Sequence, residues 1–83
     1  MSETAPDVSG LVEYIAKAMV DAPDQVLVKQ LEEGDATVLE LEVAESDMGK
    51  VIGRQGRVVR AMRALLDAVS DRFDKQYELE ILE

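Results

Sequence analysis

The chain has no cysteine and no histidine among its 83 residues. Without cysteine, disulfides and thiolate metal sites are excluded. Without histidine, the commonest general base and the commonest zinc ligand are missing. No apolar run approaches membrane-spanning length, and residues 1–7 include Glu3, Pro6 and Asp7 where a signal peptide would be basic and apolar. These absences predict a cytoplasmic protein that makes no membrane contact, is not an enzyme and carries no metal or other cofactor.

Length and composition fit a single small folded domain. A second core would be too small to survive alone in 83 residues, and an apolar content of 47% suits a folded chain. Nine basic residues stand against eighteen acidic ones, which gives a net charge of −9. Proteins that bind nucleic acid indiscriminately are usually basic overall. Any contact with a nucleic acid must therefore be local.

The basic residues are concentrated in one place. Five of the nine lie between Lys50 and Arg63, and residues 48–66 contain no acid. Inside this stretch Gly53-Arg54-Gln55-Gly56 forms a Gly-x-x-Gly turn between two helix-like segments. A short cationic turn on an anionic body is what a local contact with a phosphate backbone needs.

Hydrophobic periodicity predicts the order α-β-β-α-α-β. Residues 1–8 are expected to be a flexible tail and residues 9–83 a single domain. Ser9 is expected to cap a helix that runs to about Asp21, with Leu11, Ile15, Ala18 and Met19 on its apolar stripe, flanked by Val12 and Tyr14. Residues 25–32 and 36–44 read as strands joined by a turn at 33–35, and this short link predicts an antiparallel hairpin.

The second half of the chain continues with helices and a last strand. Ser46-Asp47 is expected to cap a short helix that Gly53 ends, and a long helix is expected over about 57–73. A final strand after residues 74–76 should run parallel to the second strand if the two are neighbours. The long helix carries more large apolar residues than so small a domain usually buries, and some of them are expected to face a partner: Val58, Met62, Leu65, Leu66, Val69 and Phe73.

Glutamates alternate with apolar residues along two strands, at Glu40 and Glu42 and again at Glu78 and Glu80. This pattern predicts a sheet with one face in solvent and three helices packed on the other. The same glutamates could be read as a carboxylate site for a metal or for acid–base chemistry. A solvated face explains them better, because no histidine, cysteine or nucleophile motif accompanies them.

The glycine turn carries the candidate site. The residues predicted to contact a nucleic acid are Lys50, Ile52, Gly53, Arg54, Gln55, Gly56, Arg57 and Arg60. An apolar slot for bases is expected beside the turn, lined by Gly49, Val51, Ile52 and Val59 and by an edge of the second strand. The three aromatic residues all lie elsewhere in the sequence, so base stacking is not expected. Unpaired bases enter a narrow slot more easily than a duplex does, which favours single strands.

The run Met48-Gly49-Lys50-Val51-Ile52-Gly53-Arg54-Gln55-Gly56-Arg57 resembles the V-I-G-x-x-G signature of K-homology (KH) domains. The helix-first order resembles their type II, prokaryotic form, and residues 11–83 are similar to the small stand-alone bacterial KH proteins of the KhpA family. The resemblance implies an α+β, type II KH-like fold with a three-stranded mixed sheet covered on one face by three helices. It also implies binding of single-stranded RNA, with Gly53 to Gly56 as a backbone clamp and Ile52 on the groove floor.

The resemblance further implies a role as an RNA chaperone or post-transcriptional regulator. Relatives form homodimers or associate with a second, larger RNA-binding protein that contains a KH domain. Two other functions stay open at this point. One is a helix-turn-helix-like DNA binder, although the basic residues cluster at the turn and strands flank the unit. The other is a protein–protein interaction module with no nucleic-acid role, which the acidic surface and the surplus apolar helix face motivate.

Overall fold

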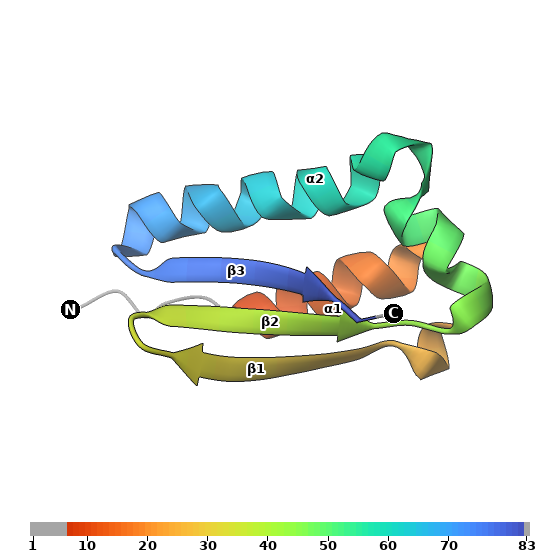
Figure 1. Ribbon diagram of the computed structural model, residues 1–83, viewed down its shortest axis with the longest axis horizontal. Helices are drawn as coiled ribbons and strands as arrows, with labels where there is room; N and C mark the ends of the chain where they lie inside the picture. Colours follow the sequence, from red (N-terminus) through yellow and green to blue (C-terminus); the bar gives the residue numbers. More distant parts are fainter. Residues whose placement is uncertain (1–6, 83) are drawn as a thin grey trace.

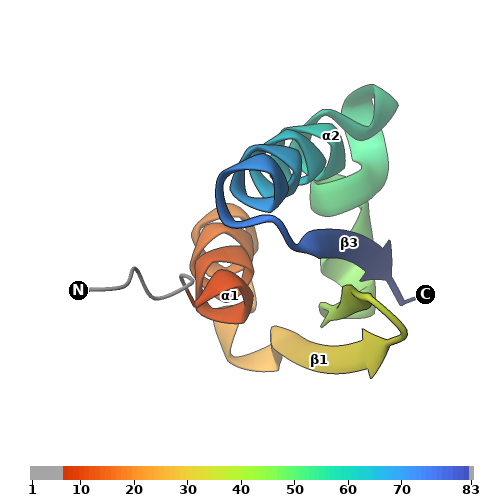
Figure 2. The same ribbon diagram turned by 90° about the vertical axis from the view of Figure 1, so that its left-hand side faces the viewer.

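The computed structural model describes residues 7–82, except for the side chain of Arg54. The elements follow in the order α1 (Val8–Met19), β1 (Leu27–Glu33), β2 (Ala36–Glu42), α2 (Met48–Phe73) and β3 (Gln76–Ile81), with 3-10 turns at Pro23–Gln25 and Glu45–Asp47. Both α-helices lie on the same side of the sheet (Figures 1 and 2). The predicted α+β class is confirmed. No helix within residues 7–82 is long and apolar enough to cross a bilayer.

Helix α1 begins earlier than predicted because Asp7, and not Ser9, is its N-cap. The Asp7 carboxylate accepts the Gly10 backbone N–H at 3.0 Å and the Ser9 hydroxyl at 2.9 Å. The helix ends at Met19, before the predicted end, and the chain is already extended at the next residue. Of the predicted tail, residues 1–6 lie outside the described part of the chain.

The buried face of α1 also differs from the predicted stripe. Its buried residues are Val8, Val12 and Ala16, which recur at a spacing of four. Tyr14 is 75% exposed, and Leu11 and Met19 are exposed too. Val8 was predicted to lie in the tail, but it is the first buried residue of the helix. The helix face that packs on the core is therefore the one that carries Val8, Val12 and Ala16.

The hairpin is confirmed. Strands β1 and β2 pair antiparallel, with Glu33 opposite Ala36 and Leu27 opposite Glu42. Gly34 turns the chain with a φ of 62°, a left-handed value that glycine adopts without steric cost. The first strand begins at Leu27, two residues later than predicted, because a 3-10 turn occupies Pro23–Gln25.

Strand β3 pairs parallel to β2, so β2 is the central strand of the mixed sheet, and the predicted parallel neighbour is confirmed. One face of the sheet is open to solvent. Residue alternation places five glutamates and one lysine on this open face, namely Lys29, Glu33, Glu40, Glu42, Glu78 and Glu80. Val38 lies on the same face but is buried between its register partners Leu31 and Glu78.

The other sheet face and the helices enclose the core. The buried members of the core cluster are Val8, Val12, Ala16, Val26, Leu39, Leu41, Val43, Val51, Val59, Met62, Leu66, Tyr77 and Leu79. Of the apolar residues predicted on the long helix, Met62 and Leu66 are fully enclosed, whereas Leu65 is 44% exposed. The sequence expectation that this helix carries apolar surface beyond the core is met at Leu65.

Helix α2 changes direction at the glycine turn. Gln55 and Gly56 have φ values of 63° and 68°, which lie outside the α-helical region. They divide the element into two arms, residues 48–54 and 57–73, which run in different directions in Figure 1. With α1, the two arms account for the three predicted helices. The break lies at Gln55-Gly56, so the prediction that Gly53 ends the first helix is wrong.

The end of α2 is tied to the start of β3 through Ser70. The Ser70 carbonyl accepts the backbone N–H groups of Asp74 and Lys75, and its hydroxyl accepts the Tyr77 N–H at 3.1 Å. Asp74 takes a left-handed conformation with a φ of 53°, which allows this turn. The connection brings β3 back beside the second arm of α2 and so forms one wall of the candidate site.

Candidate nucleic-acid interface

The glycine turn holds an uncommon backbone. Gln55 is a non-glycine residue at positive φ, a conformation that costs about 1–2 kcal/mol in an L-residue. Gly56 also has positive φ, so glycine there is explained by the backbone itself. Strained residues of this kind persist where the surrounding structure holds them, and they are common at ligand sites.

Gly53 has neither of the usual structural reasons to be glycine. Its φ is not positive, and a Cβ placed on it would meet no heavy atom of the described residues within 4 Å. In a helix, glycine is less favourable than alanine by about 1 kcal/mol. The fold therefore gains nothing from glycine at this position. A bare backbone here leaves room for a ligand to approach closely.

A cleft lies between α2 and strand β3, on the side of the turn that faces the sheet edge. Its volume is about 650 Å³. The residues that line it are Ile52, Gln55, Gly56, Val59, Arg60, Arg63, Glu80 and Ile81. This basic cleft combines an aliphatic floor with two arginines, which suits an unpaired base and its phosphate.

A second, larger cleft of about 950 Å³ meets the basic cleft at Ile52. Its apolar lining comes from Val43, Ala44, Met48, Ile52 and Leu82, with Gly49 and Gly53 on the helix side. Ile52 is 39% exposed, and it is the side chain that both clefts share. The two hollows together run along the C-terminal end of β3.

The basic side chains divide between two sides of the turn. Arg60 and Arg63 line the basic cleft, whereas Lys50 and Arg57 line a separate depression with Gly53. Lys50 Nζ lies 3.3 Å from Asp21 Oδ2. Within residues 7–82, leaving aside the Arg54 side chain, Arg57 and Arg60 form no ion pair. These two arginines are available to an external anion.

Arg63 closes one end of the basic cleft. Its Nη2 donates to the Leu79 carbonyl at 3.2 Å, which joins the second arm of α2 to the free edge of β3. Arg63 also lines a further depression on its other side, with Leu66, Asp67 and Tyr77. The guanidinium therefore separates the basic cleft from the rest of the α2–β3 boundary.

Several predicted site residues lie where the sequence placed them, and others do not. Gly49, Ile52, Gly53, Gln55, Gly56 and Arg60 border one or both of the two joined clefts. Val51 is 0% exposed, so it packs in the core beneath the turn and cannot line a groove. Val59 is also in the core, although its edge reaches the cleft. The side chain of Arg54 lies outside the described residues.

Strand β3 lines the basic cleft, and the predicted second strand contributes only its end, Glu42, to the larger cleft. Strand β2 is central and has no free edge, so Glu80 and Ile81 of β3 line the basic cleft, and Leu82, just after β3, lines the larger one. The sequence reading missed these three residues. A signal was present, because pairing the last strand beside the second strand, whose other side the hairpin occupies, leaves the last strand at the edge of the sheet.

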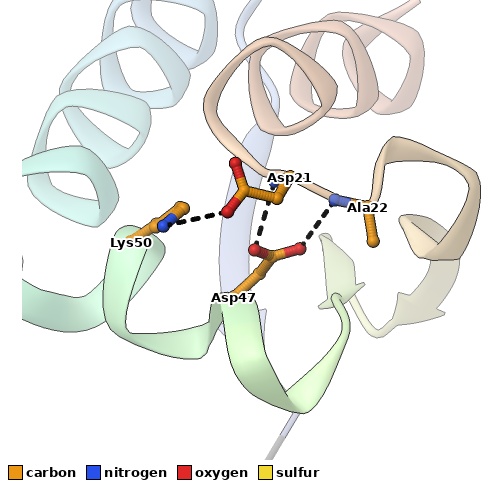
Figure 3. A network of polar contacts seen from close by, with 4 residues as sticks. All are labelled: Asp21, Ala22, Asp47 and Lys50. Atoms are coloured by element: carbon orange, nitrogen blue, oxygen red, sulfur yellow. Dashed lines mark hydrogen bonds and ion pairs between the residues drawn. The ribbon is translucent and has the colours of Figure 1, made fainter.

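Asp47 positions the first arm of α2 against α1 (Figure 3). Its side chain is 1% exposed and accepts the backbone N–H groups of Asp21 at 3.1 Å and Ala22 at 3.0 Å. Asp47 occupies the N-cap position of α2, but its carboxylate makes no capping bond to that helix. The prediction that it caps the helix is therefore wrong. Asp47 instead fixes the loop after α1, whose Asp21 faces Lys50.

Comparison with known proteins agrees with this geometry. The family model described as "KhpA/KhpB, KH domain" matches residues 9–81. The chain belongs to this family. The KhpA-like resemblance seen in the sequence is thereby confirmed, and the mixed sheet with helices on one face is the KH-type fold that it implied.

Close relatives cover most of the chain. A protein named "RNA-binding protein KhpA" from Borreliella burgdorferi is 45% identical over 73 residues, which span 88% of this chain and 89% of the relative. The protein of the same name from Clostridium acetobutylicum is 44% identical over 87% of this chain and 96% of its own length. That from Caldanaerobacter subterraneus subsp. tengcongensis is 46% identical over the same shares. The KhpA/KhpB domain accounts for nearly all of the described structure.

Proposed function

We propose that the chain binds single-stranded RNA by holding the sugar-phosphate backbone against the turn from Gly53 to Gly56. The observation that carries this proposal is Gly53, a helical glycine that neither its backbone angles nor its neighbours require. The relatives of this chain are named as RNA-binding proteins, which supports the same function.

The geometry suits a polyanion that arrives at the turn. The bare backbone at Gly53 and Gly56 lets a phosphate come close, and Arg57 and Arg60 supply charge on the two sides of the turn. Arg54 is proposed to add a third cation at the tip. Glu33, Glu40 and Glu78 lie on the open sheet face and outside both clefts, and they repel an RNA strand from that layer, which favours contact at the turn.

The bases are proposed to lie along β3. Ile52 separates the two clefts and offers an exposed aliphatic surface, and Ile81 lies across from it. Neither cleft is lined by an aromatic side chain among the described residues, so recognition rests on aliphatic contact and hydrogen bonds. A duplex keeps its bases stacked and paired, which prevents their entry into so narrow a site.

Replacing Arg54 and Gln55 together by aspartates tests the clamp. The matched control replaces Lys29 and Gln30 by aspartates, which makes the same change in formal charge on β1, at the other edge of the sheet. Binding to a fluorescent single-stranded RNA octamer is measured by anisotropy, and thermal unfolding verifies that each variant is folded. We expect a loss of about tenfold or more in the first variant only. Equal losses of RNA affinity in both double variants would mean that the turn does not clamp RNA.

Salt dependence and competition separate RNA clamping from the alternative functions. If about three phosphates are engaged, log affinity falls with log salt at a slope near −2 for a single strand. Stronger binding to duplex DNA than to the RNA octamer would favour the helix-turn-helix-like alternative. No binding to any nucleic acid would favour the protein-interaction module.

The biological role proposed is that of an RNA chaperone or post-transcriptional regulator that works as a homodimer or beside a larger KH-containing protein, with the cytoplasm as its predicted location. Leu65, exposed on the second arm of α2, is the proposed contact for such pairing. Leu65→Glu should shift the mass measured by light scattering toward the monomer. The control Lys17→Glu, on exposed α1 surface, should leave the mass unchanged.

A further inference from the structure

Glu80 is an unexpected residue in the basic cleft. The other described residues that line this cleft are aliphatic, neutral or cationic, and Glu80 alone among them carries a negative charge. A carboxylate there works against a bound phosphate. Glu78 lies two residues earlier on the same face of β3, yet it borders other hollows and not this one. Of the two glutamates on β3, only Glu80 therefore reaches the basic cleft.

The carboxylate of Glu80 is not used by the fold. Within residues 7–82, again leaving aside the Arg54 side chain, Glu80 forms no ion pair and no side-chain hydrogen bond. Arg63, which lines the same cleft, donates instead to the Leu79 carbonyl at 3.2 Å. Both oxygens of Glu80 keep their capacity to accept hydrogen bonds from a ligand.

We propose that Glu80 selects the base held in the cleft, favouring guanine and disfavouring uracil; this inference rests on the proposed RNA binding. An ionised carboxylate only accepts hydrogen bonds. The pairing edge of guanine presents two adjacent donors, N1–H and the N2 amino group, which match two carboxylate oxygens in a charge-assisted pair. Cytosine and adenine each present one amino group. Uracil presents a single N–H between two carbonyl oxygens, which repel the carboxylate.

The basic cleft offers two kinds of contact, one that accepts any nucleotide and one that depends on the base. Arg60 and the aliphatic floor of Ile52 and Ile81 accept any nucleotide, because they contact phosphate or the face of a base. Glu80 contacts the base edge and so depends on the identity of the base. The negative charge of Glu80 lowers the affinity for RNA in general, but its contact with the base edge discriminates between bases at one position.

The test compares four RNA octamers: all uridine, and the same strand with one central base replaced by guanosine, adenosine or cytidine. Wild-type protein should bind the guanosine strand on the order of tenfold more tightly than the all-uridine strand. Glu80→Gln should reduce this ratio to within about twofold, because an amide donates to the uracil carbonyls as readily as it accepts from guanine. Glu78→Gln removes the same charge from the same face and should leave the ratio unchanged.

Ratios between strands cancel any general gain from removing a negative charge. If Glu80→Gln and Glu78→Gln raise all four affinities by the same factor, Glu80 acts only through its charge and the inference is overturned. A wild-type protein that binds all four strands equally overturns it as well, while leaving the clamp intact. Arg57→Gln removes a phosphate-contacting cation outside the basic cleft, so it should weaken all four strands together and keep their ratio, which separates loss of clamping from loss of base selection.

Discussion

Lys50 Nζ lies 3.3 Å from Asp21 Oδ2, so one of the predicted RNA-binding cations is paired with a carboxylate in the unbound protein (Figure 3). Asp21 thereby takes the place that a phosphate would occupy at this lysine. The pair is well exposed, and exposed pairs contribute about 0.2–1 kcal/mol. Competition from Asp21 should therefore reduce RNA affinity by a modest factor.

Asp21→Asn is expected to raise affinity for single-stranded RNA by about two- to fivefold, because it releases Lys50 and removes a negative charge. Anisotropy titrations at low and high salt measure the change. Asp24→Asn is the control, since Asp24 lies on the same loop and is exposed but unpaired within residues 7–82. An equal gain in both variants would show that only net charge matters.

Asp47→Ala is expected to destabilise the fold by about 1–3 kcal/mol, because the part-buried N–H groups of Asp21 and Ala22 lose their acceptor. Asp47→Asn should be milder, since its amide oxygen replaces one of the two acceptors. Urea unfolding at neutral pH measures both. A loss below about 0.5 kcal/mol in the alanine variant would mean that water replaces the carboxylate at this loop.

Gly53→Ala should separate stability from binding. The backbone and the space at this position accept a Cβ, so unfolding free energy should rise by up to about 1 kcal/mol. RNA affinity should fall at the same time, because the methyl group occupies the approach of the sugar-phosphate backbone. Gly56→Ala is the contrast: its positive φ predicts a loss of stability of about 1 kcal/mol or more. Unchanged RNA affinity in a stabilised Gly53→Ala protein would mean that the bare backbone at Gly53 is not used to hold RNA.

Acid should weaken the start of α1. The Gly10 backbone N–H, and secondarily the Ser9 hydroxyl, lower the pKa of Asp7 below its usual value. The ionised cap therefore contributes its full stability above the unfolded pKa of about 3.9, and this contribution is lost as pH falls through the lower folded value. Wild type should be more stable than Asp7→Ala at neutral pH, and the difference should narrow below about pH 4. Urea titrations across this range measure it, and a constant difference would contradict the cap.

The sequence was sufficient for features that depend on local chemistry. The hairpin follows from Gly34 between two apolar runs, and the last strand follows from alternation at Tyr77 and Leu79. Gly53 and Gly56 within an acid-free basic stretch indicate the candidate site. Each of these signals lies within a few residues of the feature that it predicts.

Features that depend on distant partners were not predictable in the same way. Asp47 reads as a helix cap, but its acceptors are used by N–H groups 25 and 26 residues away. Val51 and Ile52 are adjacent and equally apolar, and only the packing of α1 and the sheet decides that one is enclosed and the other exposed. Glu80 reads as one more solvated glutamate until β3 is placed beside the turn.

Five glutamates lie on the open sheet face and the arginines lie around the turn, so negative and positive charge are separated across the molecule. A nearby polyanion exerts a torque on such a molecule even though the net charge of −9 opposes approach. We expect this torque to turn the arginines toward the polyanion before contact, which should raise the fraction of productive encounters. Added salt weakens the overall repulsion, which should raise the association rate. It also weakens the orienting torque, which should lower that rate.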